Sequence, residues 1–194
     1  YRLLQGIDNK TLETGRALWE LSRRAFAAPQ VRKVLEEEAA AAVIPTLEGS
    51  AEGRAFLTEL RVYLDKYGHR GQTCLAIHPS PSWIEDPTPV IKNLKDYIAQ
   101  PDQHPMAELQ RLAEERERLV AEARAQLQGY PRPVVEQFEF LLEAAQEGIV
   151  LTEDHAFWID YSSLYQMRRL FLEFGRRFAE SGVVEAADDV WNLT

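Results

Sequence analysis

The first segment suited to chemistry is Tyr67-Gly68-His69-Arg70-Gly71. Its two glycines flank an imidazole and a guanidinium, and glycine lets the backbone approach a ligand closely. Arg70 would offer a permanently charged fork to an oxyanion, phosphate or carboxylate, and His69 a group that titrates near neutral pH. The structural alternative is that Gly68 ends a helix in the left-handed conformation while Arg70 bonds the last carbonyls.

A second candidate segment covers residues 151–160. On a helix Glu153 and Phe157 share one side, and His155 lies about one turn from Trp158. An imidazole beside aromatic walls and carboxylates is suited to act as a general base or to bind a ligand hydroxyl. The alternative is that Glu153 only favours a helix N-terminus and that His155 is half-buried and satisfied by its neighbours.

Two further features have both a chemical and a structural interpretation. Trp83 is either the wall of a pocket or a packing anchor, with Asp86 capping a helix that begins at Pro87. Cys74 has His69 and His78 within a few residues, but their spacing does not indicate a nucleophilic pair. The sequence therefore favours Cys74 as a small packed residue.

Several common catalytic patterns are missing from the sequence. It contains no phosphate-binding Gly-x-x-x-x-Gly-Lys-Ser/Thr loop, no Gly-x-Gly-x-x-Gly, no His-Glu-x-x-His and no paired-cysteine metal site. We therefore expect no bound metal and no cofactor in this chain. A free-standing small enzyme is disfavoured, because no complete set of nucleophile and base is visible.

The composition is that of an ordinary globular protein, with 45% hydrophobic and 27% charged residues. A formal net charge of −9 argues against nucleic acid or an anionic membrane as the main partner. A single cysteine excludes an internal disulfide and favours a reducing compartment. No apolar run approaches the roughly 18 residues that span a bilayer. We expect a soluble, cytoplasmic domain.

Helical periodicity dominates, which predicts an irregular all-α domain of about six to seven helices. A single long loop, residues 68–86, contains glycines and prolines but no sustained strand-like alternation; a connection of this length tends to be functional. The expected helices lie within residues 9–28, 29–48, 50–67, 87–100, 106–128, 134–148 and 152–181. Residues 9–14 and Ser50 supply polar capping candidates, and Gly182 is a natural residue to end the last helix. In the last helix, an apolar stripe predicted to face the core is formed by Leu164, Met167, Phe171, Phe174 and Phe178.

The ends of the sequence suggest a domain of a longer protein. The first residue is Tyr1, and residues 190–194 are largely apolar, whereas natural termini usually fray into polar residues. We expect residues 1–194 to form a single helical domain cut from a multidomain protein.

The order of the segments resembles a known family. Residues 67–71, 81–87, 153–160, 182–185 and 188–194 together resemble the middle helical region of enzymes related to phosphoenolpyruvate synthase. The most similar members are rifamycin phosphotransferases and phenylphosphate synthase-like proteins. The resemblance extends from about Gly6 to the end of the chain.

This resemblance implies a protein of three parts. An ATP-grasp-like domain, with ATP and Mg²⁺, would precede this region, and a swivelling domain with a phosphorylated histidine would follow it. The helical region would bind the small-molecule acceptor of the phosphoryl group. Some relatives use the same apparatus for condensation or other ATP-driven chemistry.

The sequence departs from the family pattern at two places. Rifamycin enzymes open the last helix with Arg-Glu-x-x-Lys, whereas this chain has Thr152 and Ala156 at the two basic positions, so rifamycin is not the expected acceptor. The second departure is that none of the four histidines, His69, His78, His104 and His155, lies in the context of the phosphohistidine loop.

The leading hypothesis is a cleft in which the two segments converge around an acceptor. Its polar contacts are predicted to be His69, Arg70, Glu153 and His155. Its apolar walls are predicted to be Tyr67, Trp83, Phe157, Trp158 and Tyr161, as ligand pockets are mostly apolar with a few polar groups. The isolated chain is expected to show no ATP-dependent turnover. The alternative is a non-catalytic helical scaffold that docks on neighbouring domains.

Overall fold

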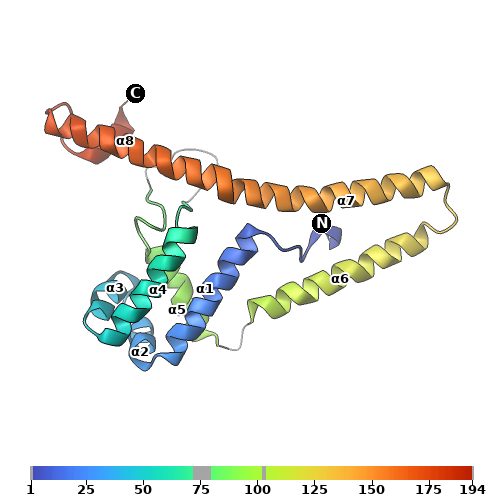
Figure 1. Cartoon of the computed structure of the whole chain (residues 1–194), viewed down its shortest axis with the longest axis horizontal. Helices are drawn as coiled ribbons and strands as arrows, with labels where there is room; N and C mark the ends of the chain where they lie inside the picture. The colour runs from blue at the N-terminus through green and yellow to red at the C-terminus, as the bar shows by residue number, and fades with distance from the viewer. Residues whose placement is uncertain (1, 72–79, 102–103, 194) are drawn as a thin grey trace.

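The computed structural model describes residues 2–71, 80–101 and 104–193, and all regular structure within them is helical (Figure 1). This confirms the predicted all-α class. Eight α-helices are accompanied by two 3₁₀ turns and one π-helical segment in these residues. The elements are η1 (Arg2–Leu4), α1 (Lys10–Ala27), α2 (Pro29–Glu37), α3 (Ala40–Glu48), α4 (Ala51–Tyr67), α5 (Thr88–Ala99), α6 (Pro105–Gln126), α7 (Arg132–His155), η2 (Ala156–Tyr161), α8 (Ser162–Glu180) and η3 (Ala187–Asn192).

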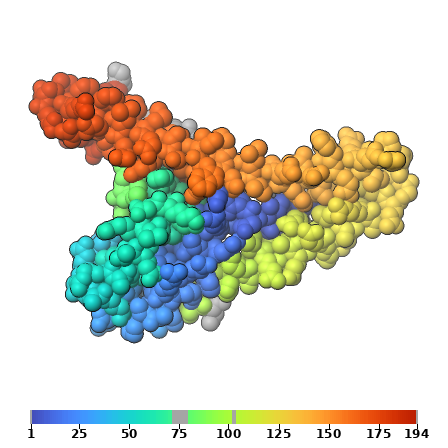
Figure 2. All heavy atoms as spheres, in the orientation of Figure 1, coloured from blue at the N-terminus to red at the C-terminus, as the bar shows by residue number. Residues whose placement is uncertain are grey.

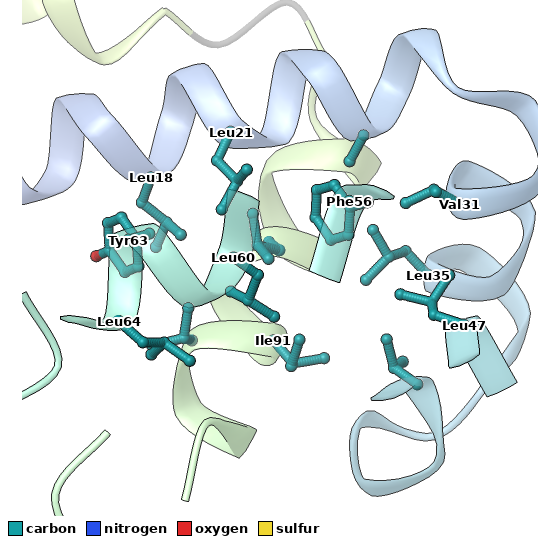
Figure 3. Close-up of a cluster of buried hydrophobic side chains, with 14 of the residues drawn as sticks. Leu18, Leu21, Val31, Leu35, Leu47, Phe56, Leu60, Tyr63, Leu64 and Ile91 are labelled. Atoms are coloured by element: carbon teal, nitrogen blue, oxygen red, sulfur yellow. The ribbon is translucent and has the colours of Figure 1, made fainter. Parts of the chain in front are cut away.

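The hydrophobic core lies among α1 to α5, which pack into a compact bundle (Figure 3). Leu35, Leu60 and Ile91 come from three different helices and are almost completely buried. Each core helix contributes apolar residues three or four positions apart, which places them on the one face that meets its neighbours. The helix starts follow local rules: Asn9 accepts a hydrogen bond from the Leu12 amide, and Ser50 one from the Gly53 amide.

The single helix predicted for residues 29–48 is wrong, because the chain is extended at Glu38 and Ala39. This break lets α2 and α3 turn toward the same core, where α2 buries Val31 and α3 buries Val43. The Lys95 ammonium donates hydrogen bonds to the carbonyl oxygens of Leu35 and Glu38 near the end of α2. A partner 60 residues away in sequence therefore stabilises this break.

The break predicted near residues 149–151 is absent, and α7, η2 and α8 form one long rod that runs above the bundle (Figure 1). Gly148 lies inside α7, where a glycine costs only about 1 kcal/mol relative to alanine. The helix α6 extends beside α7, so that the two form an arm projecting away from the bundle (Figure 2). Arg124 of α6 and Glu139 of α7 form a two-point ion pair that joins them.

The apolar stripe of α8 does not face a core, which corrects the sequence-based prediction. Met167, Phe171, Phe174 and Phe178 are 36 to 45% exposed. The short segment η3 packs on this side of α8, where Gly175 is buried against the backbone of Ala187 and the ring of Phe171 lies 5.7 Å from that of Trp191. As predicted, Gly182 ends this helix with a positive φ of 73°.

The long connection after α4 is tied together at its two ends. The amide of Trp83 donates to the carbonyl of Arg70, and the amide of Ile84 donates to that of Gly68. Asp86 accepts a hydrogen bond from the Thr88 amide at the start of α5, as the sequence predicted. Cys74 and His78 lie outside the described residues. No helix in the described ranges is both long and apolar enough to cross a membrane.

Candidate functional site

A cleft of about 260 Å³ lies where the C-terminal end of α4 meets η2. It brings together the two segments that the sequence singled out, which are more than 80 residues apart. Six of the nine predicted site residues line it: three lie within residues 67–71 and three within residues 157–161. The lining consists of Asp65, Lys66, Tyr67, His69, Arg70, Phe157, Trp158, Tyr161 and Ser162.

The aromatic wall of the cleft is presented by the π-helical segment η2. A π-helix is wider than an α-helix, and short π segments inside α-helices occur frequently at functional sites. Phe157 and Trp158 meet edge to face, with ring centroids 4.9 Å apart. Phe157 also lies 5.9 Å from the ring of Tyr67, which places aromatic rings from both sides in contact.

Arg70 is positioned by a tight turn at the end of α4. Gly68 has a φ of −79°, so the expected left-handed helix end is wrong. The reason for glycine is steric, because a Cβ there would lie 2.4 Å from the Leu64 carbonyl oxygen. The Arg70 guanidinium carbon lies 5.0 Å from the ring of Tyr161 and 5.7 Å from that of Trp83, within cation–π range.

A short chain of hydrogen bonds, through Thr11 to Glu153, also holds Arg70. Its Nη2 donates to the Thr11 hydroxyl at 3.3 Å, and that hydroxyl donates to Glu153 Oε2 at 2.6 Å. Glu153 therefore does not line the cleft but supports a residue that does. It also does not cap a helix, because it lies inside α7.

His69 lies in the cleft wall with its ring half-buried. The imidazole stacks on Tyr165 of α8, with centroids 4.6 Å apart and an angle of 16° between the planes. Burial lowers the pKa of His69 below its ordinary value, although the nearby Asp65 carboxylate acts in the opposite direction. A neutral imidazole at the edge of a cleft is suited to accept a proton.

Glu13 is the centre of a polar cluster directly behind Tyr67. Its carboxylate accepts hydrogen bonds from the Tyr67 hydroxyl at 2.8 Å, from Lys66 at 2.9 Å and from Lys10. The bonds from Lys10 and Lys66 are the main reason that the pKa of Glu13 falls to about 2. Lys10 also lies 5.3 Å from the ring of Trp158, so this cluster fixes residues on both sides of the cleft.

A pH-dependent stability follows from the lowered pKa of Glu13. A carboxylate with a pKa lower in the folded than in the unfolded chain stabilises the fold above its unfolded pKa and loses that contribution as the pH falls. We expect the Glu13→Gln variant to be less stable than the wild type at pH 7, with the difference shrinking as the pH falls from about 5 toward 2. Urea unfolding at several pH values measures this.

The matched control is Glu36→Gln, which removes an exposed ion pair with Arg32 inside one helix. Exposed pairs of this kind contribute little, so its effect is expected to be small. A stability difference for Glu13→Gln that does not change with pH would contradict the assignment.

Two of the predicted residues lie outside the cleft, in addition to Glu153. His155 is exposed and its Nδ1 lies 3.2 Å from Asp160 Oδ2, so it belongs to the rod surface. Trp83 is half-buried and packs against the core, as the structural interpretation proposed. It contacts Arg70, whose carbonyl accepts a hydrogen bond from the Trp83 amide and whose guanidinium lies over the Trp83 ring.

Sequence reasoning missed several residues that line or support the cleft. Asp65 and Lys66 lie three and two residues before Gly68 and carried no separate motif. Thr11 and Glu13 lie near the start of α1, where the only sequence signal was the capping pattern. The described residues contain no group of three or more histidine, cysteine or acidic side chains that could hold a metal ion.

The chain is thus an all-helical domain with an aromatic cleft. Residues 1–153 match the model of the rifampicin phosphotransferase fourth domain, so the chain belongs to this family. The resemblance predicted from the ordered motifs is thereby confirmed.

Two relatives align over the whole of this chain. It is 41% identical over 194 residues to chondramide synthase cmdD of Chondromyces crocatus and spans 5% of that protein. It is 29% identical over 195 residues to the uncharacterized phosphotransferase YvkC of Bacillus subtilis (strain 168) and spans 23% of it.

Proposed function

We propose that the cleft between α4 and η2 binds the acceptor substrate of a multidomain, ATP-dependent phosphotransferase. The phosphoryl group would come from a histidine on another domain, and ATP with Mg²⁺ would be bound by a third. The observation that carries the proposal is the convergence of His69 and Arg70 with the aromatic residues of η2 in one cleft. Membership of the rifampicin phosphotransferase family supports it.

The chemistry of the cleft fits a small acceptor with an apolar or aromatic body and a hydroxyl group. Phe157, Trp158 and Tyr67 would hold the body of such a ligand. At the other end, His69 would accept the hydroxyl proton as the acceptor oxygen attacks phosphorus and the bond from phosphorus to the carrier histidine breaks. Arg70 would stabilise the charge on the transferred group, since a guanidinium forms strong paired bonds to phosphate.

The test of this proposal separates loading of the protein from transfer to the acceptor. The parent protein is incubated with radiolabelled ATP and a panel of small hydroxylated aromatic compounds. We expect Arg70→Ala to lower label transfer to the acceptor by about 10- to 100-fold, the range for losing a hydrogen bond to a charged group. Labelling of the protein itself is expected to change less than twofold.

Arg61→Ala supplies the matched control, because Arg61 is an exposed arginine on the same helix. It is expected to leave both steps unchanged. Full transfer by the Arg70 variant would refute the proposal, and so would a parallel loss of protein labelling.

A second candidate function is a helical docking module without a catalytic role. The observation that favours it is the exposed apolar stripe of α8, which includes Phe171, Phe174 and Phe178. Under this alternative the cleft is only a surface feature, and substitutions of His69 and Arg70 that leave the fold intact would not change activity.

A further inference from the structure

We infer that the acceptor is an extended, amphipathic molecule, and that its distal part lies in a second groove between α1 and α4. This inference rests on the proposed function of the cleft and specifies its substrate class. The groove has a volume of about 310 Å³ and shares two lining residues, Lys66 and Tyr67, with the cleft. The two hollows therefore adjoin each other at these residues.

The volumes of the two hollows favour a ligand that uses both. Pockets for small molecules typically measure about 300–1,000 Å³. The cleft alone, at about 260 Å³, falls below that range, and the groove alone lies at its lower edge. Together they fall within it.

The character of the groove determines which part of a ligand it suits. Its floor contains Leu21 and Tyr63, which belong to the rigid core and are only 5% exposed. Val62 lies at the groove with 65% of its surface exposed, an apolar side chain without a packing role in the bundle. An apolar chain that covers Val62 and this floor removes apolar surface from water, which favours binding.

Ion pairs between α1 and α4 mark the two ends of the groove. Arg24 and Glu59 pair at 2.8 Å at the far end, and Lys66 pairs with Glu13 where the groove meets the cleft. From Ala17 to Arg24, a rise of 1.5 Å per residue gives a length of about 10 Å. Because the Lys66 side chain is 57% exposed, it can move aside to let a chain pass while Lys10 and Tyr67 still bond to Glu13.

The experiment uses phenol, 4-butylphenol and 4-hexylphenol as probes of the parent protein, with affinity measured by calorimetry. Burying a methylene completely is worth roughly fourfold in affinity, and a half-open groove is expected to give about half of that free energy. We expect affinity to rise by about tenfold or more from phenol to 4-hexylphenol. In Val62→Glu the rise is expected to fall below about threefold, while the affinity for phenol stays within about twofold.

Val183→Glu is the matched control, because Val183 is 66% exposed, almost the same as Val62, and lies after α8 away from the groove. This variant is expected to keep the full rise in affinity from phenol to 4-hexylphenol. Trp158→Ala is expected to weaken all three probes equally, and thermal unfolding shows that each variant is folded.

The outcomes separate the groove from the cleft. If Trp158→Ala weakens binding but Val62→Glu keeps the rise, or Val183→Glu loses it equally, the groove inference is overturned and the cleft stands. If the probes bind equally well in Trp158→Ala, the proposed site of binding fails. If none of the three probes binds, the inference is overturned. The proposed function is then still tested by label transfer to another acceptor.

Discussion

Replacing His69 by alanine in the parent protein is expected to lower phosphoryl transfer to the acceptor by about 10²- to 10⁴-fold, the usual contribution of a general base. The imidazole lines the cleft and is stacked on Tyr165, which would hold it in place to receive the acceptor proton in the proposed reaction. Initial rates with a saturating acceptor found in the label-transfer panel measure the effect. Because His69 lies at the surface of the cleft, the loss of stability is expected to be small.

His155→Ala is the matched control for this prediction. Both histidines were candidates in the sequence, but His155 lies outside the cleft beside Asp160. Its replacement is expected to change the rate by less than about twofold. A similar loss in both variants, or none in His69→Ala, contradicts the role of His69 and favours the docking module. Below the pKa of His69 the wild-type rate is expected to fall with decreasing pH, because the protonated imidazole cannot accept the proton.

The largest effect on stability is expected from Gly53→Ala. A Cβ at this position would lie 2.0 Å from the carbonyl oxygen of Leu47, and the carbonyl carbon and Cα of Leu47 are also closer than 3 Å. These are backbone atoms at the end of α3, so α3 and α4 would have to move apart within the core. We expect a loss of about 3 kcal/mol in the free energy of unfolding, the upper part of the usual range for overpacking.

The opposite effect on stability is expected for Gly15→Ala. Gly15 also lies inside a helix, but a Cβ there would meet nothing within 4 Å. Alanine is expected to stabilise the protein by about 0.5–1 kcal/mol, because glycine is the poorer helix former. Urea unfolding of the two variants measures both effects. Stability of Gly53→Ala within about 0.5 kcal/mol of the wild type would show that the α3–α4 contact is not close packed.

The sequence alone was sufficient for features that depend on near neighbours. The helical class, the caps at Asn9 and Ser50 and the helix end at Gly182 are set by residues within a few positions of one another. The sequence also indicated the residues of the two halves of the cleft. His69 and Arg70 follow a helix and a glycine, and the aromatic residues within 157–161 form one compact segment.

Tertiary structure decided which helical faces have partners. Hydrophobic periodicity shows that Phe171, Phe174 and Phe178 lie on one side of α8, but it does not show that η3 covers only part of that side and leaves these residues partly exposed. At the break between α2 and α3, a backbone carbonyl is bonded by Lys95, which reaches it from α5. Such contacts join positions far apart in sequence, and local pattern carries no information about them.

The same reason explains why the site was only partly foreseen. The π-helical segment sets which residues after position 155 turn toward α4, so Phe157, Trp158 and Tyr161 enter the cleft while His155 remains outside. Glu153 was expected to act on a ligand or a helix end, but a long-range partner, Thr11, makes it a support for Arg70. Residue types indicated the chemistry available, whereas the packing of α1, α4 and the rod determined which side chains meet.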